Sequence, residues 1–447
     1  MNAFKAYDIR GVYNRDFNKE DVYKIGFFLP QLLKTKKVLV GRDVRTSSPE
    51  IFKYLTQGIT DSGADVYDTG LATTPMIYWG TAHYKFDASV MITASHNPKE
   101  YNGLKVSAGN ALPVGYDSGL SELEKLIQTQ TPKPVNQKGK VIANDFRKEY
   151  LAFQQAKLKD ISNLNIAVDV SNGMAALFIR DILGDDVHYI FDELDGTFPN
   201  HEANPLEPEN IVDIQKLVKD TKADFGVIFD GDADRVMFVD ENSRFISPDL
   251  IIALLANHFL KDKEKGVRVL QDIRTSKAVG EYIAKFNGEM HMWRVGRAYA
   301  ALKLREIDGL FGGELAGHYY FKEFYYSDSG LMAASLVLNI VSDFKKQGIS
   351  LSQIINQIEV YKNSGEINFK IEQKQEAMDA VIAHFKSTGT ADAFYDFDGY
   401  RIEFPDWWLN IRPSNTEPYL RFLAEAKTTE LLDKIVSEST TIIKRFK

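Results

Sequence analysis

The stretch FGVIFDGDADRVMFVD, residues 225–240, joins two apolar runs through a short loop that carries three aspartates at alternate positions. Continuous apolar runs of four or five residues are typical of strands buried on both faces of a sheet. Polar loops that follow such strands commonly carry the chemistry of α/β proteins. The stretch therefore predicts a buried strand, a functional loop, and a neighbouring strand that returns over residues 236–239.

Strand-like and helix-like segments alternate on both sides of this stretch. Short apolar runs predict strands, and Ser-Pro or Thr-Pro pairs, as at 48–49 and 74–75, are typical of helix starts. The predicted strands are residues 38–40, 64–67, 88–92, 166–170, 187–190, 267–270 and 290–295. The predicted helices are residues 48–63, 174–183, 211–222, 249–260, 276–286, 329–344 and 429–445. This alternation favours mostly parallel sheets.

The alternating pattern restarts twice along the chain, which suggests an internal repeat of roughly a hundred residues. At 447 residues the chain is too long for one core. After Gly348 the predicted strands become shorter and more polar. We expect an α/β fold of three similar mixed α/β domains and a C-terminal α+β domain, with limits at residues 1–142, 143–244, 245–357 and 358–447.

Composition excludes several classes of function. The net charge of -8 gives no general basic field for a nucleic acid or an anionic membrane, so an anionic substrate must be held locally. The absence of cysteine excludes disulfides, thiolate metal sites and a cysteine nucleophile. We see neither a signal-peptide pattern in MNAFKAYDIRG nor an apolar stretch that would span a membrane, and expect a soluble, cytoplasmic protein.

The three aspartates of the loop, Asp230, Asp232 and Asp234, suggest a cation site. Alternate residues of an extended chain lie about 6.5 Å apart, and a curled loop would bring them closer. Two carboxylates about 5 Å apart repel by about 3 kcal/mol at an effective dielectric of about 20. Convergence therefore requires a cation, and oxygen ligands suit magnesium or calcium. A solvated turn whose acids splay apart is the alternative.

An EF-hand is a sharper alternative for the same loop, because its aspartates and Glu241 fall on the ligand positions of that motif. The sixth position requires glycine and is Arg235 here. The flanks also read as strands, whereas an EF-hand needs helices. We therefore reject this interpretation.

The segment TASHNP, residues 93–98, places Ser95 where a predicted strand opens into a loop. A hydrolytic triad is disfavoured because adjacent side chains on extended backbone point to opposite faces, which places His96 poorly for deprotonating Ser95. An exposed serine can instead carry a phosphoryl group, which a magnesium ion in the acidic loop would neutralise. Lys105, returned by an Asn-Gly turn, could act as a general acid or base if its pKa is lowered; otherwise it is a surface lysine.

Further segments offer groups that could bind an anion or a sugar. Residues 412–418, RPSNTEP, concentrate hydrogen-bond donors, and Arg421 follows. Residues 312–318, GGELAGH, offer Glu314 and His318 to sugar hydroxyls. Each segment could equally be a plain turn, and Tyr7, Asp8, Arg10, Arg42 and Asp43 could belong to surface ion pairs.

Taken in order, the motifs KAYDIRG, GRDVRTSSP, TASHNPKEYNGLK, DGDADR, GGELAGH and RPSNTEP resemble the α-D-phosphohexomutase family, in its phosphomannomutase and phosphoglucomutase branch. The resemblance spans residues 4–421. It implies four domains around a central active-site cleft. It also implies an isomerase that exchanges phosphate between O1 and O6 of a hexose through a phosphoserine and a hexose 1,6-bisphosphate, which would also serve as activator.

The resemblance assigns a role to each candidate residue. Ser95 would be the phosphoserine, and Mg²⁺ would be bound by its phosphate together with Asp230, Asp232 and Asp234. The reacting end would be lined by Tyr7, Arg10, His96, Lys105 and Arg235, of which the last three would join Ser95 in catalysis. Sugar hydroxyls would contact Glu314 and His318. The phosphate that is not transferred would be held by Arg412, Ser414, Asn415, Thr416 and Arg421.

Two positions depart from the family's pattern. Ala316 stands where the sugar loop usually has serine, and Arg297 stands where the branch typically has histidine. Arg297 is expected to contact a phosphate or hydroxyl, or to indicate a different hexose. The alternatives are a phosphoglucosamine mutase, a magnesium-dependent sugar phosphatase, or a non-catalytic sugar-phosphate-binding or calcium-binding protein. We expect the partners of this protein to be small sugar phosphates. We expect the protein to be a monomer or a weak dimer.

Overall fold

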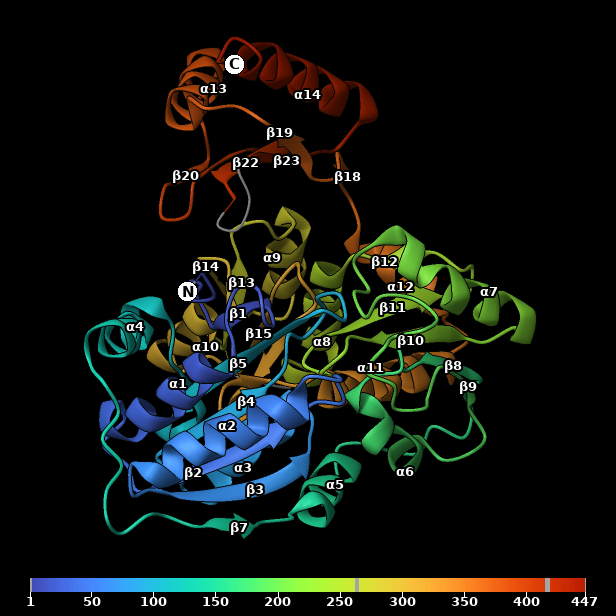
Figure 1. The fold of residues 1–447 in the computed structure, drawn as a ribbon. Coiled ribbons are helices and arrows are strands. Elements are labelled where there is room, and N and C mark those ends of the chain that lie inside the picture. The colour runs from blue at the N-terminus through green and yellow to red at the C-terminus, as the bar shows by residue number, and fades with distance from the viewer. Residues whose placement is uncertain (1, 262–264, 415–418, 447) are drawn as a thin grey trace.

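The computed structural model describes residues 2–261, 265–414 and 419–446, and within them the strands form four separate sheets. Three sheets lie together in one large body, and the fourth forms a C-terminal body on one side of it (Figure 1). This arrangement confirms the expected fold class of three mixed α/β units and a C-terminal α+β unit.

The first sheet has the order β1-β5-β4-β2-β3-β7, with β6 paired to β5. Its strands are β1 (Ile9–Val12), β2 (Lys37–Arg42), β3 (Asp65–Leu71), β4 (Ala88–Ile92), β5 (Tyr101–Ala108), β6 (Leu112–Pro113) and β7 (Val141–Ala143). Strands β2, β3, β4 and β7 pair in parallel, and β5 runs antiparallel to β4. The associated helices are α1 (Lys19–Leu32), α2 (Ser48–Asp61), α3 (Thr74–His83) and α4 (Leu120–Thr129).

The second sheet has the order β12-β11-β10-β8-β9. It consists of β8 (Ile166–Asp169), β9 (His188–Ile190), β10 (Phe225–Phe229), β11 (Val236–Asp240) and β12 (Phe245–Ile246). Strands β10 and β11 pair antiparallel, which confirms the returning strand. The helices of this unit are α5 (Arg147–Gln155), α6 (Ile179–Leu183) and α7 (Val212–Thr221), together with the short 3-10 helix η4 (Pro208–Ile211).

The single helix predicted over residues 174–183 is wrong. A 3-10 helix, η3 (Met174–Leu177), is followed by α6, and Phe178 separates them. The backbone N–H of Met174 donates to the carbonyl of Gly231 at 2.9 Å. The start of the segment is therefore attached to the acidic loop, a tertiary contact that its own sequence does not reveal.

The third sheet has the order β14-β13-β15-β16-β17. Its strands are β13 (Arg268–Asp272), β14 (Glu289–Trp293), β15 (Phe311–Gly313), β16 (Tyr319–Phe321) and β17 (Ser327–Asp328). Its helices are α8 (Pro248–Phe259), α9 (Lys277–Ala284), α10 (Arg297–Glu306), α11 (Gly330–Lys345) and α12 (Leu351–Ile358).

The fourth sheet consists of β18 (Lys362–Asn363), β19 (Ile367–Phe369), β20 (Ala393–Tyr395), β21 (Tyr400–Phe404), β22 (Trp407–Pro413) and β23 (Leu420–Ala426). Helices α13 (Lys374–Thr388) and α14 (Thr429–Ile443) lie over one face of it (Figure 1). The sequence predicted α14 but not α13. The opposite face of the sheet is turned toward the large body.

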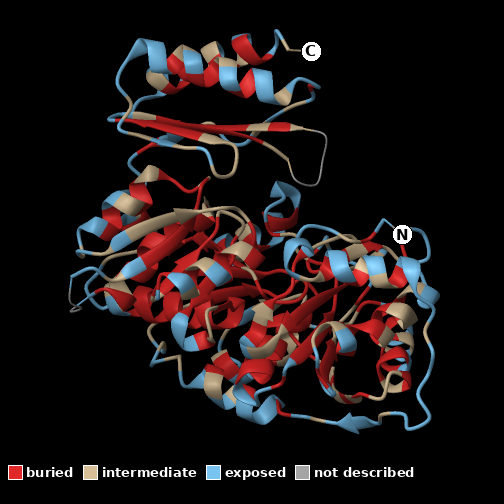
Figure 2. Ribbon diagram, turned by 90° about the vertical axis from the view of Figure 1, so that its left-hand side faces the viewer, coloured by how far each residue is buried: buried red, intermediate tan, exposed pale blue. Residues whose placement is uncertain are grey.

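One large apolar cluster extends across the first three units, most of the first unit has a further cluster of its own, and the core of the fourth unit is separate. One cluster of buried residues joins α3 to the second and third sheets, and another lies entirely within the C-terminal body. Figure 2 shows buried residues running through the large body and, separately, along the fourth sheet. The C-terminal body therefore meets the rest mainly through polar contacts. Among residues 2–261, 265–414 and 419–446, every helix is too short or too polar to cross a membrane.

Candidate functional site

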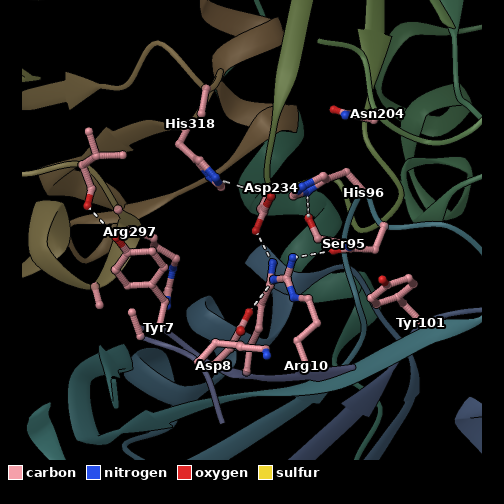
Figure 3. A pocket seen from close by; sticks show the side chains of 18 of the residues that line it. Tyr7, Asp8, Arg10, Ser95, His96, Tyr101, Asn204, Asp234, Arg297 and His318 are labelled. Atoms are coloured by element: carbon pink, nitrogen blue, oxygen red, sulfur yellow. Dashed lines mark hydrogen bonds and ion pairs between the residues drawn. The ribbon is translucent and has the colours of Figure 1, made fainter. Parts of the chain in front are cut away.

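A cleft with a volume of about 1210 Å³ is lined by residues from all four units. Figure 3 shows Ser95, His96, Asp234 and His318 directed toward one another, with Arg10, Tyr7 and Arg297 nearby. The cleft brings together the sequence-predicted residues Tyr7, Arg10, Ser95, His96, Lys105, Asp234, Arg235, Arg297, Glu314, His318, Arg412, Ser414 and Arg421. Asp230 and Asp232 lie fully buried in the same loop as Asp234. Asn415 and Thr416 lie outside the described residues.

Ser95 lies just beyond the end of β4, in left-handed backbone with φ of 52°. Its side-chain oxygen donates to Asp230 Oδ2 at 2.8 Å, and the residue is 1% exposed. The backbone N–H of Ser95 donates to Thr93 Oγ1 at 2.9 Å. These contacts fix the hydroxyl beside the acidic loop.

His96 is closer to Ser95 than extended backbone would allow. Its Nδ1 lies 3.3 Å from Ser95 Oγ, so the prediction that His96 is poorly placed is wrong. The physical reason is the left-handed conformation of Ser95, which turns the two side chains to the same side. Burial, reinforced by the charges of Arg235 and Arg10, lowers the pKa of His96 well below its usual value. The single hydrogen of the Ser95 hydroxyl is donated to Asp230, so the neutral imidazole of His96 lies close enough to take that hydrogen only when the contact with Asp230 is broken.

The aspartates of the acidic loop converge. Ligand oxygens of Asp230, Asp232 and Asp234 lie within 4.8 Å of one another, and all three residues are 0% exposed. This burial excludes the solvated turn, and strands on both sides of the loop confirm that it is not an EF-hand. The loop curls at Ala233, whose φ is 62°.

The environment of these carboxylates suits a hard cation. Burial, together with the charges of Asp234 and Asp232, raises the pKa of Asp230 well above its usual value. Asp232 Oδ1 and Asp234 Oδ1 are buried and find no hydrogen-bond partner in the described part of the chain. Buried carboxylate oxygens without partners are costly unless a cation compensates them. The donor set therefore fits Mg²⁺.

Lys105 differs from both expectations. It is 8% exposed, so it is not a surface lysine, and it lies within β5, so no Asn-Gly turn precedes it. Gly103 serves another purpose: a Cβ there would lie 2.2 Å from the carbonyl of Ile9 on β1. Lys105 Nζ contacts Asp232 Oδ2 at 2.7 Å and Asp234 Oδ2 at 2.5 Å. Burial alone would lower its pKa, but these carboxylates outweigh burial and raise it.

The N-terminal motif contributes to the cleft and is not a surface ion pair. Asp8 is 8% exposed and pairs with Arg10, whose guanidinium also donates to Asn97 Oδ1 at 2.8 Å. Tyr7 donates its hydroxyl to the carbonyl of Val295 at 2.9 Å, across to the third unit. Asp43, which could also have been a surface residue, is 3% exposed.

The glycine-rich loop of residues 312–318 lies against the acidic loop. Glu314 Oε1 accepts from the hydroxyl of Tyr320 at 2.7 Å, and burial raises the pKa of Glu314. His318 Nε2 accepts from Arg235 Nε at 2.9 Å. Gly317 has φ of 83°, and a Cβ there would lie 2.4 Å from Met237 Cε. Glycine is thus required for this loop to approach β11.

Guanidinium groups gather at the side of the cleft that the C-terminal body forms. Arg412 on β22 pairs in register with Arg421 on β23, and both line the cleft together with Arg274 of the third unit. Burial and the charge of Arg274 lower the pKa of Arg412. Such a cluster of cations favours an anionic group of the ligand.

Sequence reasoning missed three residues. Arg45 is 1% exposed and donates to the carbonyls of Ser95 and Asn97 at 2.8 and 2.6 Å. Arg274 lines the cleft, and Asp328 contacts His318. The pattern Asp-x-Arg, which occurs at 8–10, 43–45 and 272–274, could have indicated both arginines, although it also occurs at 145–147, an exposed ion pair outside the cleft. No comparable signal marks Asp328.

Nearly the whole chain is similar to one family of known proteins. Four models named phosphoglucomutase/phosphomannomutase match it: α/β/α domain I at residues 1–134, domain II at 145–243, domain III at 247–361 and the C-terminal domain at 366–441. A phosphomannomutase of Methanocaldococcus jannaschii is 36% identical, over 99% of this chain and 98% of that protein. One of Vibrio cholerae is 35% identical, over 100% and 99%.

A solved structure shows the same architecture. The crystal structure of a phosphoglucomutase/phosphomannomutase family protein from Burkholderia thailandensis superposes with a TM-score of 0.89 and 28% identity. It covers 99% of this chain and 97% of its own. The likeness therefore extends over all four units.

Proposed function

Because the chain belongs to the phosphoglucomutase/phosphomannomutase family, a family of isomerases, we propose that it moves phosphate reversibly between O1 and O6 of mannose or glucose phosphates through a phosphoserine at Ser95. The observation that carries this proposal is the contact of Ser95 Oγ with Asp230 at 2.8 Å, inside a cleft whose opposite side is rich in arginine. A phosphoryl group on Ser95 would lie beside the acidic loop.

We propose that Asp230, Asp232 and Asp234 hold Mg²⁺ together with an oxygen of the phosphoserine. Bound there, the ion supplies neutralisation of the negative charge on the phosphoryl group during transfer. The two partnerless oxygens, Asp232 Oδ1 and Asp234 Oδ1, support this assignment. Lys105 lies against two of these carboxylates and would add a second positive charge beside the phosphoryl group.

In the proposed reaction the sugar hydroxyl forms a bond to phosphorus as the bond from phosphorus to Ser95 Oγ breaks, and the proton of the hydroxyl passes to Ser95 Oγ. The product is a hexose 1,6-bisphosphate, which turns around in the cleft. In the return step Ser95 Oγ forms a bond to the other phosphorus as the bond from that phosphorus to the sugar oxygen breaks. Neutral His96 can accept the serine's proton at Nδ1 and pass it to the departing sugar oxygen. Arg235 and Arg10 would neutralise charge at this reacting end.

Fixed contacts must accept the sugar in both orientations. We propose that Arg412, Ser414, Asn415, Thr416 and Arg421 hold the phosphate that is not transferred, and that Glu314 and His318 bind hydroxyls. The two phosphates of the bisphosphate take turns as the group that is transferred and the group that is held. A mutase therefore needs a strong anion site, which a phosphatase can do without. Added hexose 1,6-bisphosphate would act as an activator by restoring the phosphoserine.

The identity of the hexose is also part of the proposal. The relatives named phosphomannomutase favour mannose and glucose phosphates, while Ala316 and Arg297 depart from the family pattern. Coupled assays with mannose, glucose and glucosamine phosphates separate these choices. Turnover of the amino sugar alone would identify a phosphoglucosamine mutase instead.

We also propose the domain limits 1–142, 143–244, 245–357 and 358–447, a cytoplasmic location, and a monomer or weak dimer. One sheet falls almost entirely within each range. Strand β7 extends one residue past the first limit, and β12 lies just beyond the second.

Ser95 is tested directly by mass and by turnover. Intact mass spectrometry of the purified protein should find one phosphoryl group, mapped to Ser95. The Ser95→Ala variant should lack it and lose nearly all turnover, while Ser89→Ala, a buried serine on β4 that contacts Thr81, should keep both. Release of inorganic phosphate without isomerisation would point to a phosphatase, and full activity in Ser95→Ala would remove the proposed role.

A further inference from the structure

Asp328, at the end of β17, lies behind the glycine-rich loop. It is 0% exposed, and it is not among the described residues that line the cleft, although two of its partners are. Asp328 Oδ2 lies 2.6 Å from His318 Nδ1, and Asp328 Oδ1 accepts from Arg297 Nε at 2.9 Å. One buried carboxylate therefore connects two residues of the cleft.

The other nitrogen of His318 determines where the imidazole carries its proton. Arg235 Nε lies 2.9 Å from His318 Nε2, and a guanidinium can only donate. His318 Nε2 must therefore present its lone pair. The neutral ring then carries its hydrogen on Nδ1, which donates to Asp328. The contacts on the two sides of the ring select the same tautomer.

We propose that Asp328 is a positioning residue, which holds His318 in the Nδ1–H tautomer, so that the Nε2 lone pair accepts from Arg235 Nε and holds that guanidinium at the reacting end. This inference rests on the proposed function, in which Arg235 neutralises charge at the reacting end. Figure 3 shows His318 pointing into the pocket toward Asp234. In the opposite tautomer, His318 Nε2–H would face Arg235 Nε–H, and two donors would oppose each other.

An asparagine at this position would remove the partner of His318 Nδ1–H. The carboxylate of Asp328 accepts from Arg297 on one oxygen and from His318 on the other. An amide has only one accepting oxygen, and Arg297 cannot cease to donate. The amide nitrogen would therefore face His318 Nδ1–H, and two donors would oppose each other there while Arg235 still requires the Nε2 lone pair.

The wild-type protein provides the first test. Nitrogen-15 NMR of protein labelled in its histidine rings distinguishes protonated from unprotonated ring nitrogens, and His318→Gln assigns the signals of His318 by their loss. At mildly alkaline pH, where an ordinary imidazole is neutral, we expect Nδ1 to be protonated and Nε2 not. An Nε2–H tautomer in the wild type would overturn the proposal without any further variant.

The Asp328→Asn variant provides the second test. We expect its His318 Nδ1 signal to shift because the hydrogen bond of Nδ1–H is lost, and its turnover to fall by about 10- to 100-fold, the range seen when a carboxylate that orients a metal-binding histidine is lost. The matched control is Asp240→Asn, another buried aspartate that contacts an arginine, Arg244, outside the cleft. It should change neither the tautomer nor turnover.

The tautomer is measured without substrate, so the inference about Asp328 can be wrong independently of the proposed function. The expected tautomer in a protein without mutase activity would contradict the function and leave the role of Asp328 in orienting His318. Unchanged His318 signals in folded Asp328→Asn, with wild-type turnover, would overturn the inference and leave the proposed mutase intact.

Discussion

At the scale of single residues, Arg45 shows how one buried side chain orders the loop that carries Ser95. Its guanidinium donates to the carbonyls of Pro98 and Tyr101 at 2.7 and 3.1 Å, in addition to those of Ser95 and Asn97. Its charge is balanced by Asp43, at 3.2 Å. The planar fork of an arginine can serve several acceptors at once, which a lysine cannot.

We therefore predict that Arg45→Lys lowers the free energy of unfolding by about 3 kcal/mol, because buried carbonyls and a buried carboxylate lose their partner. Turnover should fall as well, since the Ser95 loop loses its support. Urea denaturation and a mutase assay measure these effects. Arg147→Lys, at an exposed ion pair with Asp145, is the matched control and should be unchanged. Equal stability of the two variants would show that Arg45 does not anchor the loop.

At the scale of elements, the acidic loop between β10 and β11 is the decisive connection. Asp230 lies beside Ser95, and Asp234 lies beside His318. Both positions are fixed because neighbouring segments bind the backbone of the loop on its two sides. The backbone of Gly231 accepts from Met174, and the carbonyl of Ala233 accepts from the backbone N–H of Gly330. The loop is thus held in its curled form by a segment of its own unit and by a segment of the third unit.

We predict that Mg²⁺ raises the melting temperature of the wild type, because an ion that binds only the folded state stabilises it. Asp232→Asn should keep the fold, lose most of this rise and lose most turnover. Thermal melting at increasing Mg²⁺ concentration measures the effect. Asp220→Asn, at an exposed ion pair on α7, should respond like the wild type. A melting temperature that does not change with Mg²⁺ concentration in any of the three proteins would contradict the proposed metal site.

At the scale of the whole molecule, a polar contact connects the C-terminal body to the third unit. Glu425 on β23 accepts from Ser276 Oγ at 2.6 Å and from Trp408 Nε1 at 2.8 Å, both on Oε2. Its other oxygen accepts from Asn363 Nδ2 at 2.8 Å. Burial, with a contribution from the charge of Asp249, raises the pKa of Glu425 to about 7.

This pKa makes the interface sensitive to pH near neutrality. The folded protein binds the proton of Glu425 more tightly than the unfolded chain does. The protonated Glu425 therefore contributes fully to stability below about pH 4.5, and this contribution is lost as the pH rises to about 7. The shift corresponds to about 3 kcal/mol. We predict that the stability of the wild type falls over this range relative to that of Glu425→Gln.

The measurement is urea denaturation followed by tryptophan fluorescence, which reports on all four tryptophans, including Trp408 beside Glu425. The difference between the wild type and Glu425→Gln should grow with rising pH. Glu122→Gln, at an exposed position of α4, should stay parallel to the wild type. Parallel curves for Glu425→Gln would mean that this carboxyl does not carry the pH dependence.

The fold and much of the cleft could be predicted because their signals are local. Buried strands appear as short apolar runs, and β4, β8 and β10 lie where the pattern places them. Glycines, charged groups and hydroxyls cluster in the loops that follow, so the motifs identify most of the cleft's lining. The single helix predicted over residues 174–183 was wrong because a contact with Gly231 determines where this segment starts.

The sequence by itself determined the four-unit architecture and the types of side chain at the site, because each follows from neighbouring residues. Only the tertiary structure decided how those groups behave. Lys105 meets Asp232 across 127 residues of sequence, and that contact makes its pKa rise where a lowered one was considered. His96 reaches Ser95 through one left-handed residue, and Asp328 reaches His318 through strand pairing. Protonation depends on charge, burial and distance, and these are set only when distant segments pack together.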